Sequence, residues 1–236
     1  MKILQFIPSP EVGLRNASPA KDHVPEWYRK SERFFKKGEE DMAGLKTCAP
    51  FLDALISGYT MTTWEDIHVN TMGDEPVVTT YNLGSEFKNT SSLNNSLMIG
   101  FRPFESGALI PRPAGHAEDH MIWSNKLGLK TPRGYSVLFT HPLNRFDLPF
   151  TTLSGIIDAD KWSTSGNIPF FFKKNVDVFI PKGTPFVQII PIKRADWRHA
   201  FSEKHITQDL EEYGQAARQV KSGYYRDNKW QKKTHQ

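Results

Sequence analysis

The stretch that decides the fold is residues 155–190, GIIDADKWSTSGNIPFFFKKNVDVFIPKGTPFVQII. Short runs of β-branched and aromatic residues follow one another closely, and each run is bounded by Gly, Pro, Asn or Asp. No helical spacing of apolar residues separates these runs. Closely spaced strands of this kind are typical of a sandwich or barrel-like β unit and not of an alternating α/β sheet. Pro169 is expected at an edge or at the start of its strand, because proline lacks the backbone N–H.

The residues upstream extend the same pattern. GYSVLFTHP at 134–142 predicts a strong strand, and two shorter strands are expected at 121–123 and 127–132. Alternating β-branched residues predict strands at TMTTW, IHVNTM and VVTTYN within 60–82, with the turn cluster GDEP before the last of them. Residues 84–120 are expected to form a long loop or insertion with one strand-like piece at Leu97–Phe101.

Helical patterns lie on both sides of the β region. We expect a helix over Pro25–Lys37 that Gly38 ends, a second helix over Pro50–Ser57, and a C-terminal helix within 203–225. The predicted fold is therefore mainly β, with a β-clip-like or β-sandwich core, short N-terminal helices and one C-terminal helix. We interpret residues 1–236 as a single domain, whose parts are an N-terminal helical segment (1–58), a β core (59–198) with the loop 84–120, the C-terminal helix and a basic tail (226–236).

Composition narrows the class of protein. Cys48 is the single cysteine in 236 residues, which excludes an intrachain disulfide and fits a reducing compartment. The N-terminus has too few apolar residues for a signal peptide, and no window approaches a membrane span. We therefore expect a cytoplasmic protein, in the host cytoplasm if it is viral, without a membrane partner.

The charge is uneven along the chain. The net charge is +4, and much of the excess follows Arg218. This basic tail carries Tyr224, Tyr225 and Trp230, so contact with nucleic acid through phosphates and stacking is one interpretation. The other is a solvated helix end and a frayed terminus. Lys193 and Arg194 are expected to be solvated where their strand ends.

Residues 132–192 resemble the signature of the dUTPase and dCTP-deaminase family, which has a β-clip fold. The matching residues keep the family's order and nearly its spacing. They are Pro132–Tyr135, Gly155, Ile157, Asp158, Asp160, Gly166, Lys182, Gly183, Gln188 and Ile189.

The resemblance implies roles for some of these residues. In dUTPases the aspartate at the Asp158 position contacts the deoxyribose and activates the attacking water, and the aromatic after the second aspartate stacks on the sugar. Here Lys161 stands at the aromatic position and Trp162 follows one residue later. The phosphate-binding motif is reduced to Arg145, and the family's uracil-side motif and glycine-rich lid have no counterpart. The candidate catalytic residues are thus Asp158 and Asp160, and the candidate substrate-binding residues are Arg145, Trp162 and Gln188.

The chain also resembles a family of tailed-phage and marine viral proteins. The similar segments are Pro132–Phe139, His141–Arg145, Gly155–Asp160 and Ile180–Arg194. This resemblance supplies a context and implies no reaction.

Two other residue groups have alternative interpretations. His116 and Glu118, with a distant histidine, have the residue types of a non-haem iron site; the alternative is a polar loop. Asp158 and Asp160 are either a pair of acids for acid–base chemistry or the formers of a tight turn.

These observations favour a non-catalytic, homo-oligomeric binding or structural component of phage type on a dUTPase-like scaffold. The alternatives are a deoxynucleotide pyrophosphatase and a metal-dependent oxygenase. The partners expected are nucleotide or nucleic acid, and the sequence indicates no particular cofactor.

Overall fold

The computed structural model describes residues 2–8, 15–73, 77–81, 98–101, 110–163, 166–202, 210–211, 214 and 225–235. The chain forms two compact units. The first consists of Met1–Pro19 and Gly58–Arg194, and the second consists of Ala20–Ser57 and Ala195–Gln236.

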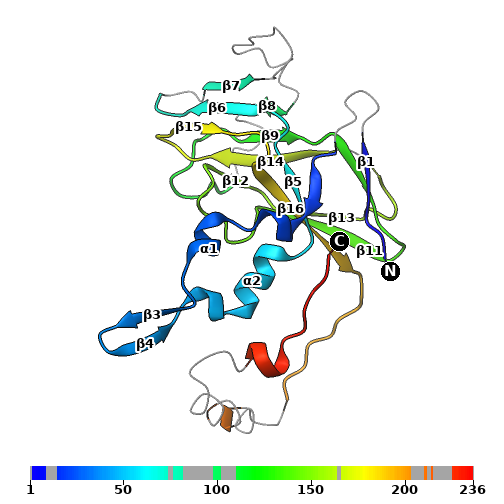
Figure 1. Ribbon diagram of the computed structural model, residues 1–236. Coiled ribbons are helices and arrows are strands. Elements are labelled where there is room, and N and C mark those ends of the chain that lie inside the picture. Colours follow the sequence, from blue (N-terminus) through cyan, green and yellow to red (C-terminus); the bar gives the residue numbers. More distant parts are fainter. Residues whose placement is uncertain are drawn as a thin grey trace. The chain divides into compact units, whose positions relative to one another are not determined.

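The first unit is built on antiparallel strands (Figure 1). Its largest sheet has five strands in the order β13-β11-β16-β5-β2, so β13 and β2 lie at its two edges. The bounds are β2 Ala17–Pro19, β5 Tyr59–Thr62, β11 Tyr135–Thr140, β13 Gly155–Ile157 and β16 Pro185–Lys193.

The other strands of this unit form three smaller sheets. A four-stranded sheet has the order β12-β14-β9-β8, a three-stranded sheet has the order β15-β6-β7, and β1 pairs with β10. The prediction of a mainly β fold is confirmed. The bounds are β1 Gln5–Pro8, β6 Asp66–Asn70, β7 Val77–Tyr81, β8 Ile99–Phe101, β9 Met121–Ser124, β10 Leu127–Lys130, β12 Phe150–Thr152, β14 Asn167–Phe172 and β15 Asp177–Ile180.

Aromatic side chains fill the core of the first unit. The fully buried Trp123 of β9 stacks on Phe170 of β14, with ring centroids 3.9 Å apart and planes 12° apart. Its ring also lies 4.9 Å from Phe150 and 5.1 Å from Phe186, which lies at the irregularity between Pro185 and Val187 of β16. Since Phe186 belongs to the five-stranded sheet, these contacts join the two largest sheets, as expected for a sandwich.

Pro169 lies inside β14 and not at an edge of the sheet. Its C=O accepts the N–H of Leu153 (2.8 Å), but a proline has no N–H to return. The pairing of β12 along β14 accordingly covers Phe150–Thr152 and stops there. On the side of β12, Pro169 therefore lies just before the paired part of its strand, in keeping with the expectation of an edge or a strand start.

The second unit contains short helices and a hairpin (Figure 1). The helix expected over 25–37 ends early, since α1 covers only Glu26–Lys30 and Ser31 is already extended. Phe34–Lys37 (β3) pairs with Glu40–Ala43 (β4), and Lys36 forms an ion pair with Asp41 (2.8 Å). Gly38, with φ of 66°, therefore makes a hairpin turn and does not end a helix.

The other helix of this unit follows the sequence prediction. Its α2 spans Ala49–Ile56, with Pro50 in the first turn. Shorter helical turns occur at η1 Ala20–His23, η2 Leu45–Thr47 and η4 Tyr225–Lys229. Most of the predicted C-terminal helix and much of the loop 84–120 lie outside the described residues. In the described part of the chain, no helix has the length and hydropathy needed to cross a membrane.

Candidate binding pocket

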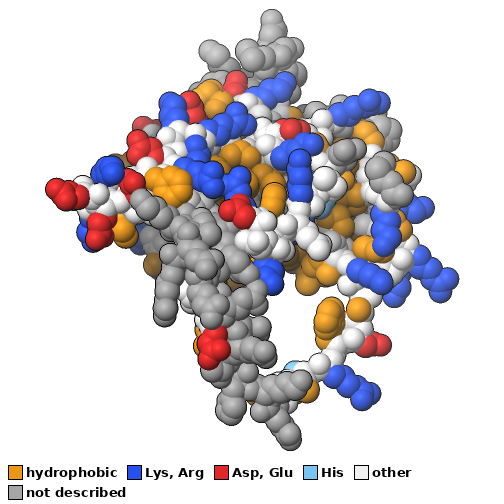
Figure 2. Space-filling view, turned by 60° about the horizontal axis from the view of Figure 1, so that its bottom comes forward, with side chains coloured by type: hydrophobic (Ala, Val, Ile, Leu, Met, Phe, Trp, Pro, Cys, Tyr) orange, Lys and Arg blue, Asp and Glu red, His pale blue; other side chains and the backbone are white. Residues whose placement is uncertain are grey.

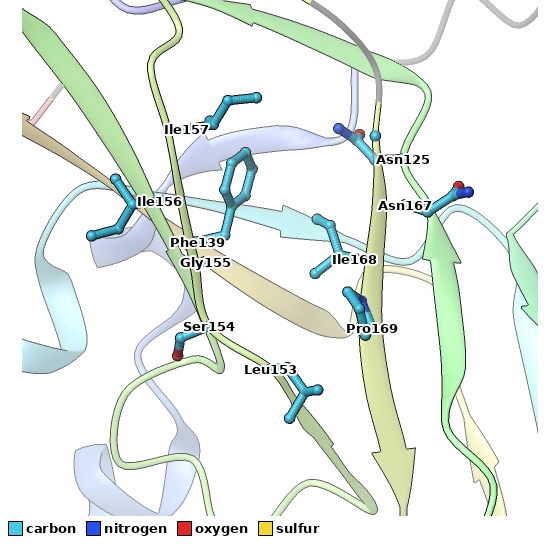
Figure 3. Close-up of a pocket in the computed structure, with 11 residues that line it drawn as sticks. Asn125, Phe139, Leu153, Ser154, Gly155, Ile156, Ile157, Asn167, Ile168 and Pro169 are labelled. Carbon is cyan, nitrogen blue, oxygen red and sulfur yellow. The ribbon is translucent and has the colours of Figure 1, made fainter. Parts of the chain in front are cut away.

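A pocket of about 220 Å³ lies between β13 and the start of β14 (Figure 3). The side chains of Phe139, Leu153, Ile157 and Ile168 and the ring of Pro169 make most of its lining apolar. This volume suits a single heterocycle better than a drug-sized ligand, whose pockets are usually larger.

One wall of the pocket is the outer edge of β13. The N–H of Arg194 donates to the C=O of Gly134 (2.9 Å), so even-numbered residues of β11 direct their backbone groups toward β16. Odd-numbered residues therefore face β13, and Val137 pairs with Ile157. The residue between the bonded pairs, Ile156, must direct its N–H and C=O away from β11, toward the edge of the sheet.

The opposite wall is the start of β14. The C=O of Gly166 accepts the N–H of Asn125 (3.2 Å), so Gly166 faces β9. By alternation, Asn167 directs its N–H and C=O to the other side of the strand, where the pairing of β12 has already stopped at Pro169. Within the described residues, no strand pairs with β14 at that position. The pocket therefore lies between two strand edges with backbone donors and acceptors.

Two polar side chains of the lining, those of Asn125 and Ser154, already have partners. The amide of Asn125 donates to the C=O of Leu127 (2.7 Å) and accepts its N–H (2.9 Å). The hydroxyl of Ser154 shares a hydrogen bond with that of Thr140 (2.9 Å). Directional contacts to a ligand would hence come from backbone groups or from the amide of Asn167, and the apolar side chains would contact its faces.

Asp158 and Asp160 follow β13 and share one cation, Arg194. Nη1 of Arg194 lies 2.9 Å from Oδ1 of Asp160 and 3.0 Å from Oδ1 of Asp158, and its Nη2 bonds Oδ2 of Asp160. Ser136 donates to Asp158 (2.7 Å), and the N–H of Gly134 donates to Asp160 (2.8 Å). The Asp160 side chain is 5% exposed and that of Asp158 is 46% exposed.

These contacts lower the pKa of both carboxyls. The hydrogen bond from Arg194, followed by that from Gly134, lowers the pKa of Asp160 to about 2. The pKa of Asp158 is lowered mainly by the Ser136 hydrogen bond and also by the nearby Arg194. A carboxylate with a lowered pKa is a weaker base. The geometry thus favours a structural role for the two acids over activation of a water.

The remaining predicted substrate contacts are spread over the first unit. Trp162 lies near Asp158, whose C=O accepts the Trp162 N–H (3.1 Å), and its side chain is 66% exposed. Arg145 forms a two-pronged ion pair with Asp147, with two bonds of 2.9 Å. The buried Gln188 accepts the N–H of Leu143 (2.8 Å). Neither Arg145 nor Gln188 lines the pocket.

The two predicted metal ligands have different partners in the structure. One ring nitrogen of His116 lies 2.9 Å from the Thr151 hydroxyl, and the other lies 3.1 Å from the C=O of Ala114. Glu118 is 70% exposed and pairs with Arg112 (2.7 Å). Among the described residues, no three His, Cys, Asp or Glu side chains are grouped as metal ligands. The metal site stays a prediction that this geometry does not support.

Sequence reasoning missed the two residues that define the site. Arg194 was expected to be solvated, yet it bonds two acids that lie 34 and 36 positions earlier in the chain. Asn167 lines the pocket, and the direction of its backbone groups follows from strand pairing, which its residue type does not indicate. The one sequence signal was Pro169, two residues later, because a proline limits the pairing of its strand.

Comparison of the chain with protein-family models, with curated proteins and with solved structures finds no match.

Proposed function

We propose that this chain is a binding protein that holds one small planar heterocycle, of nucleobase size, in the pocket between β13 and β14. The observation that carries the proposal is the pair of strand edges at Ile156 and Asn167, which face an apolar space of about 220 Å³. A planar heterocycle has donors and acceptors on its rim and apolar faces. Its rim can bond the two strand edges while its faces pack on Phe139 and Ile168.

The resemblance of residues 132–192 to dUTPases supports a nucleotide as the ligand class. Catalysis is not part of the leading proposal, because the low pKa of Asp158 makes its carboxylate a weak base. The alternative is a deoxynucleotide pyrophosphatase. Its supporting observation is that Asp158 directly follows the pocket residue Ile157 and is 46% exposed.

The wider partners stay predictions. We retain a homo-oligomeric binding or structural component of phage type as the context for this pocket. Figure 2 shows lysine and arginine side chains interspersed with acidic and hydrophobic ones, and the net charge of +4 suits an anionic partner. In the C-terminal tail, Trp230 donates to Asp53 of α2 (2.9 Å) and Lys233 pairs with the same carboxylate. These two residues are therefore already engaged, which weakens the interpretation of the tail as a nucleic-acid contact.

The proposal is tested by ligand binding to wild type and to a variant with a filled pocket. Free bases, nucleosides and deoxynucleoside triphosphates are screened by thermal shift, and binders are measured by calorimetry. Gly155→Leu fills the pocket without backbone conflict, because nothing lies within 4 Å of a Cβ at Gly155. Gly73→Leu is the matched control, since Gly73 has the same open space and lies outside the pocket.

The expected result is a ligand that raises the Tm of wild type and of Gly73→Leu but not of Gly155→Leu. A panel without any binder, or equal binding by Gly155→Leu, would refute the proposal. Release of pyrophosphate that is lost in Asp158→Asn would establish the enzymatic alternative instead.

A further inference from the structure

We infer that Arg194 is a positioning residue that holds the segment after β13, residues 158–162, against the sheet and thereby keeps the two walls of the pocket in place. This inference rests on the proposed binding function and adds the element that preorganises the site. The segment 158–162 is called the connector below, because it leads from β13 toward β14.

Arg194 is bonded to two separate parts of the first unit, the connector and residues 134–136 at the start of β11. Its guanidinium bonds Asp158 and Asp160 of the connector. The same guanidinium lies within 3.3 Å of the C=O of Tyr135 and 3.2 Å of the Ser136 hydroxyl, both at the start of β11. Its backbone N–H donates to Gly134. A planar guanidinium can bond several acceptors at fixed angles, which a lysine cannot do.

Apart from the side chain of Ala159, which is buried in the core, the connector has few other links to the sheet. The bonds from the N–H groups of Lys161 and Trp162 to the C=O of Asp158 (3.0 and 3.1 Å) are local and close only a turn. The tertiary backbone bond of the connector is the one from the N–H of Thr131 to the C=O of Ala159, at 3.3 Å. The two aspartates therefore provide most of its bonds to the rest of the unit in the described chain.

The positive charge of Arg194 also keeps the carboxylates of Asp158 and Asp160 close together. Its Nη1 touches one oxygen of each aspartate, so removal of the guanidinium leaves two carboxylates close together. Like charges at such separation repel each other. Lys161, 4.0 Å from Asp158, is exposed and compensates only weakly. Loss of Arg194 should therefore move the connector away from the sheet, and Ile157, which precedes it, lines the pocket.

The connector contains its own spectroscopic probe, Trp162. In protein labelled with 5-fluorotryptophan, the Trp162 resonance is assigned with Trp162→Phe, and the buried Trp123 serves as the internal reference. We compare wild type with Arg194→Met, Arg194→Lys and Asp160→Asn. Gly155→Leu is the control, because it alters the pocket and leaves the contacts of Arg194 intact.

We expect the Trp162 resonance to shift or broaden in Arg194→Met and Asp160→Asn, while the Trp123 resonance stays in place. Arg194→Lys should restore the wild-type resonance only in part. The double variant Arg194→Met/Asp160→Asn should resemble Arg194→Met, because the two residues act as one unit. An unchanged Trp162 resonance in folded Arg194→Met would overturn the inference. If Arg194→Met does not fold, an unchanged resonance in Asp160→Asn has the same meaning.

This spectrum needs no ligand, so its result is independent of the proposed function. A changed Trp162 resonance together with an empty ligand panel would leave the positioning role intact and remove the binding role. With deoxyuridine as the probe, we expect Arg194→Met to bind at least tenfold more weakly than wild type. Equal affinity in the two proteins would show that the connector does not organise the pocket.

Discussion

The hydroxyl of Thr152 joins the two largest sheets, and its removal offers a quantitative test of the core. Thr152 of β12 is almost fully buried. Its Oγ1 accepts the indole N–H of Trp123 (3.1 Å) and donates to the C=O of Phe186 (2.6 Å). Thr152→Val keeps the shape of the side chain and leaves both groups without this partner in the core.

A buried polar group that loses its partner costs about 1–3 kcal/mol. Two such groups give a range of about 2–6 kcal/mol, and we expect Thr152→Val to lie in its lower half, at roughly 3 kcal/mol. At about 2–3 kcal/mol per molar urea, this lowers the unfolding midpoint by about 1 M. The corresponding fall in Tm is roughly 8 °C for a chain of this size.

The assay is urea unfolding followed by circular dichroism, with Trp123→Phe as the second arm of a double-mutant cycle. In that background the indole N–H is already absent, so Thr152→Val should cost about 1–2 kcal/mol less than in wild type. A cost of under about 0.5 kcal/mol in wild type, or equal costs in both backgrounds, would refute the bridging role.

Three further predictions concern single positions. Gly58→Ala should lower the free energy of unfolding, measured in urea, by at least about 2 kcal/mol. The reason is that φ of Gly58 is 71° and a Cβ there would lie 2.1 Å from the carbonyl oxygen of Ile189. Gly183→Ala, with φ of 90° but open space around the Cβ, should cost less, and equal costs would contradict the steric argument. Burial raises the pKa of Glu65 in the folded protein. Its protonated side chain therefore stabilises the fold at a pH below the pKa of the unfolded chain, and this contribution is lost as pH rises through the pKa of the folded protein. Glu65→Gln should accordingly raise Tm at pH 7 but not at pH 4, and a lower Tm at pH 7 would show that the carboxylate is stabilising. Burial lowers the pKa of His141, so its neutral side chain stabilises the fold above the pKa of the unfolded chain, and this contribution is lost as pH falls below about 6.5. The decrease in Tm between pH 7 and 5 should therefore be smaller in His141→Gln. An unchanged decrease would assign the pH dependence to other groups.

The sequence alone determined the class of fold and several of its elements. Strands β11, β13, β14, β15 and β16 were predicted from local alternation and from bounding turn residues, and α2 from proline at its start. These signals are local, since each depends on a few neighbouring residues. Within the candidate site, sequence reasoning identified Asp158, Asp160 and Trp162, which the structure places on the connector next to the pocket.

Only the tertiary structure decided which side chains and which strand edges meet. Phe34–Lys37 was predicted to end a helix, yet its pairing with Glu40–Ala43 across Gly38 makes it a strand of a hairpin. Arg194 looked like a solvated strand end until β16 was placed beside β11, with the two acids of the connector next to it. The open edges at Ile156 and Asn167 depend on which partner strands stop short. That property comes from register between distant segments, and the local periodicity of a sequence does not contain it.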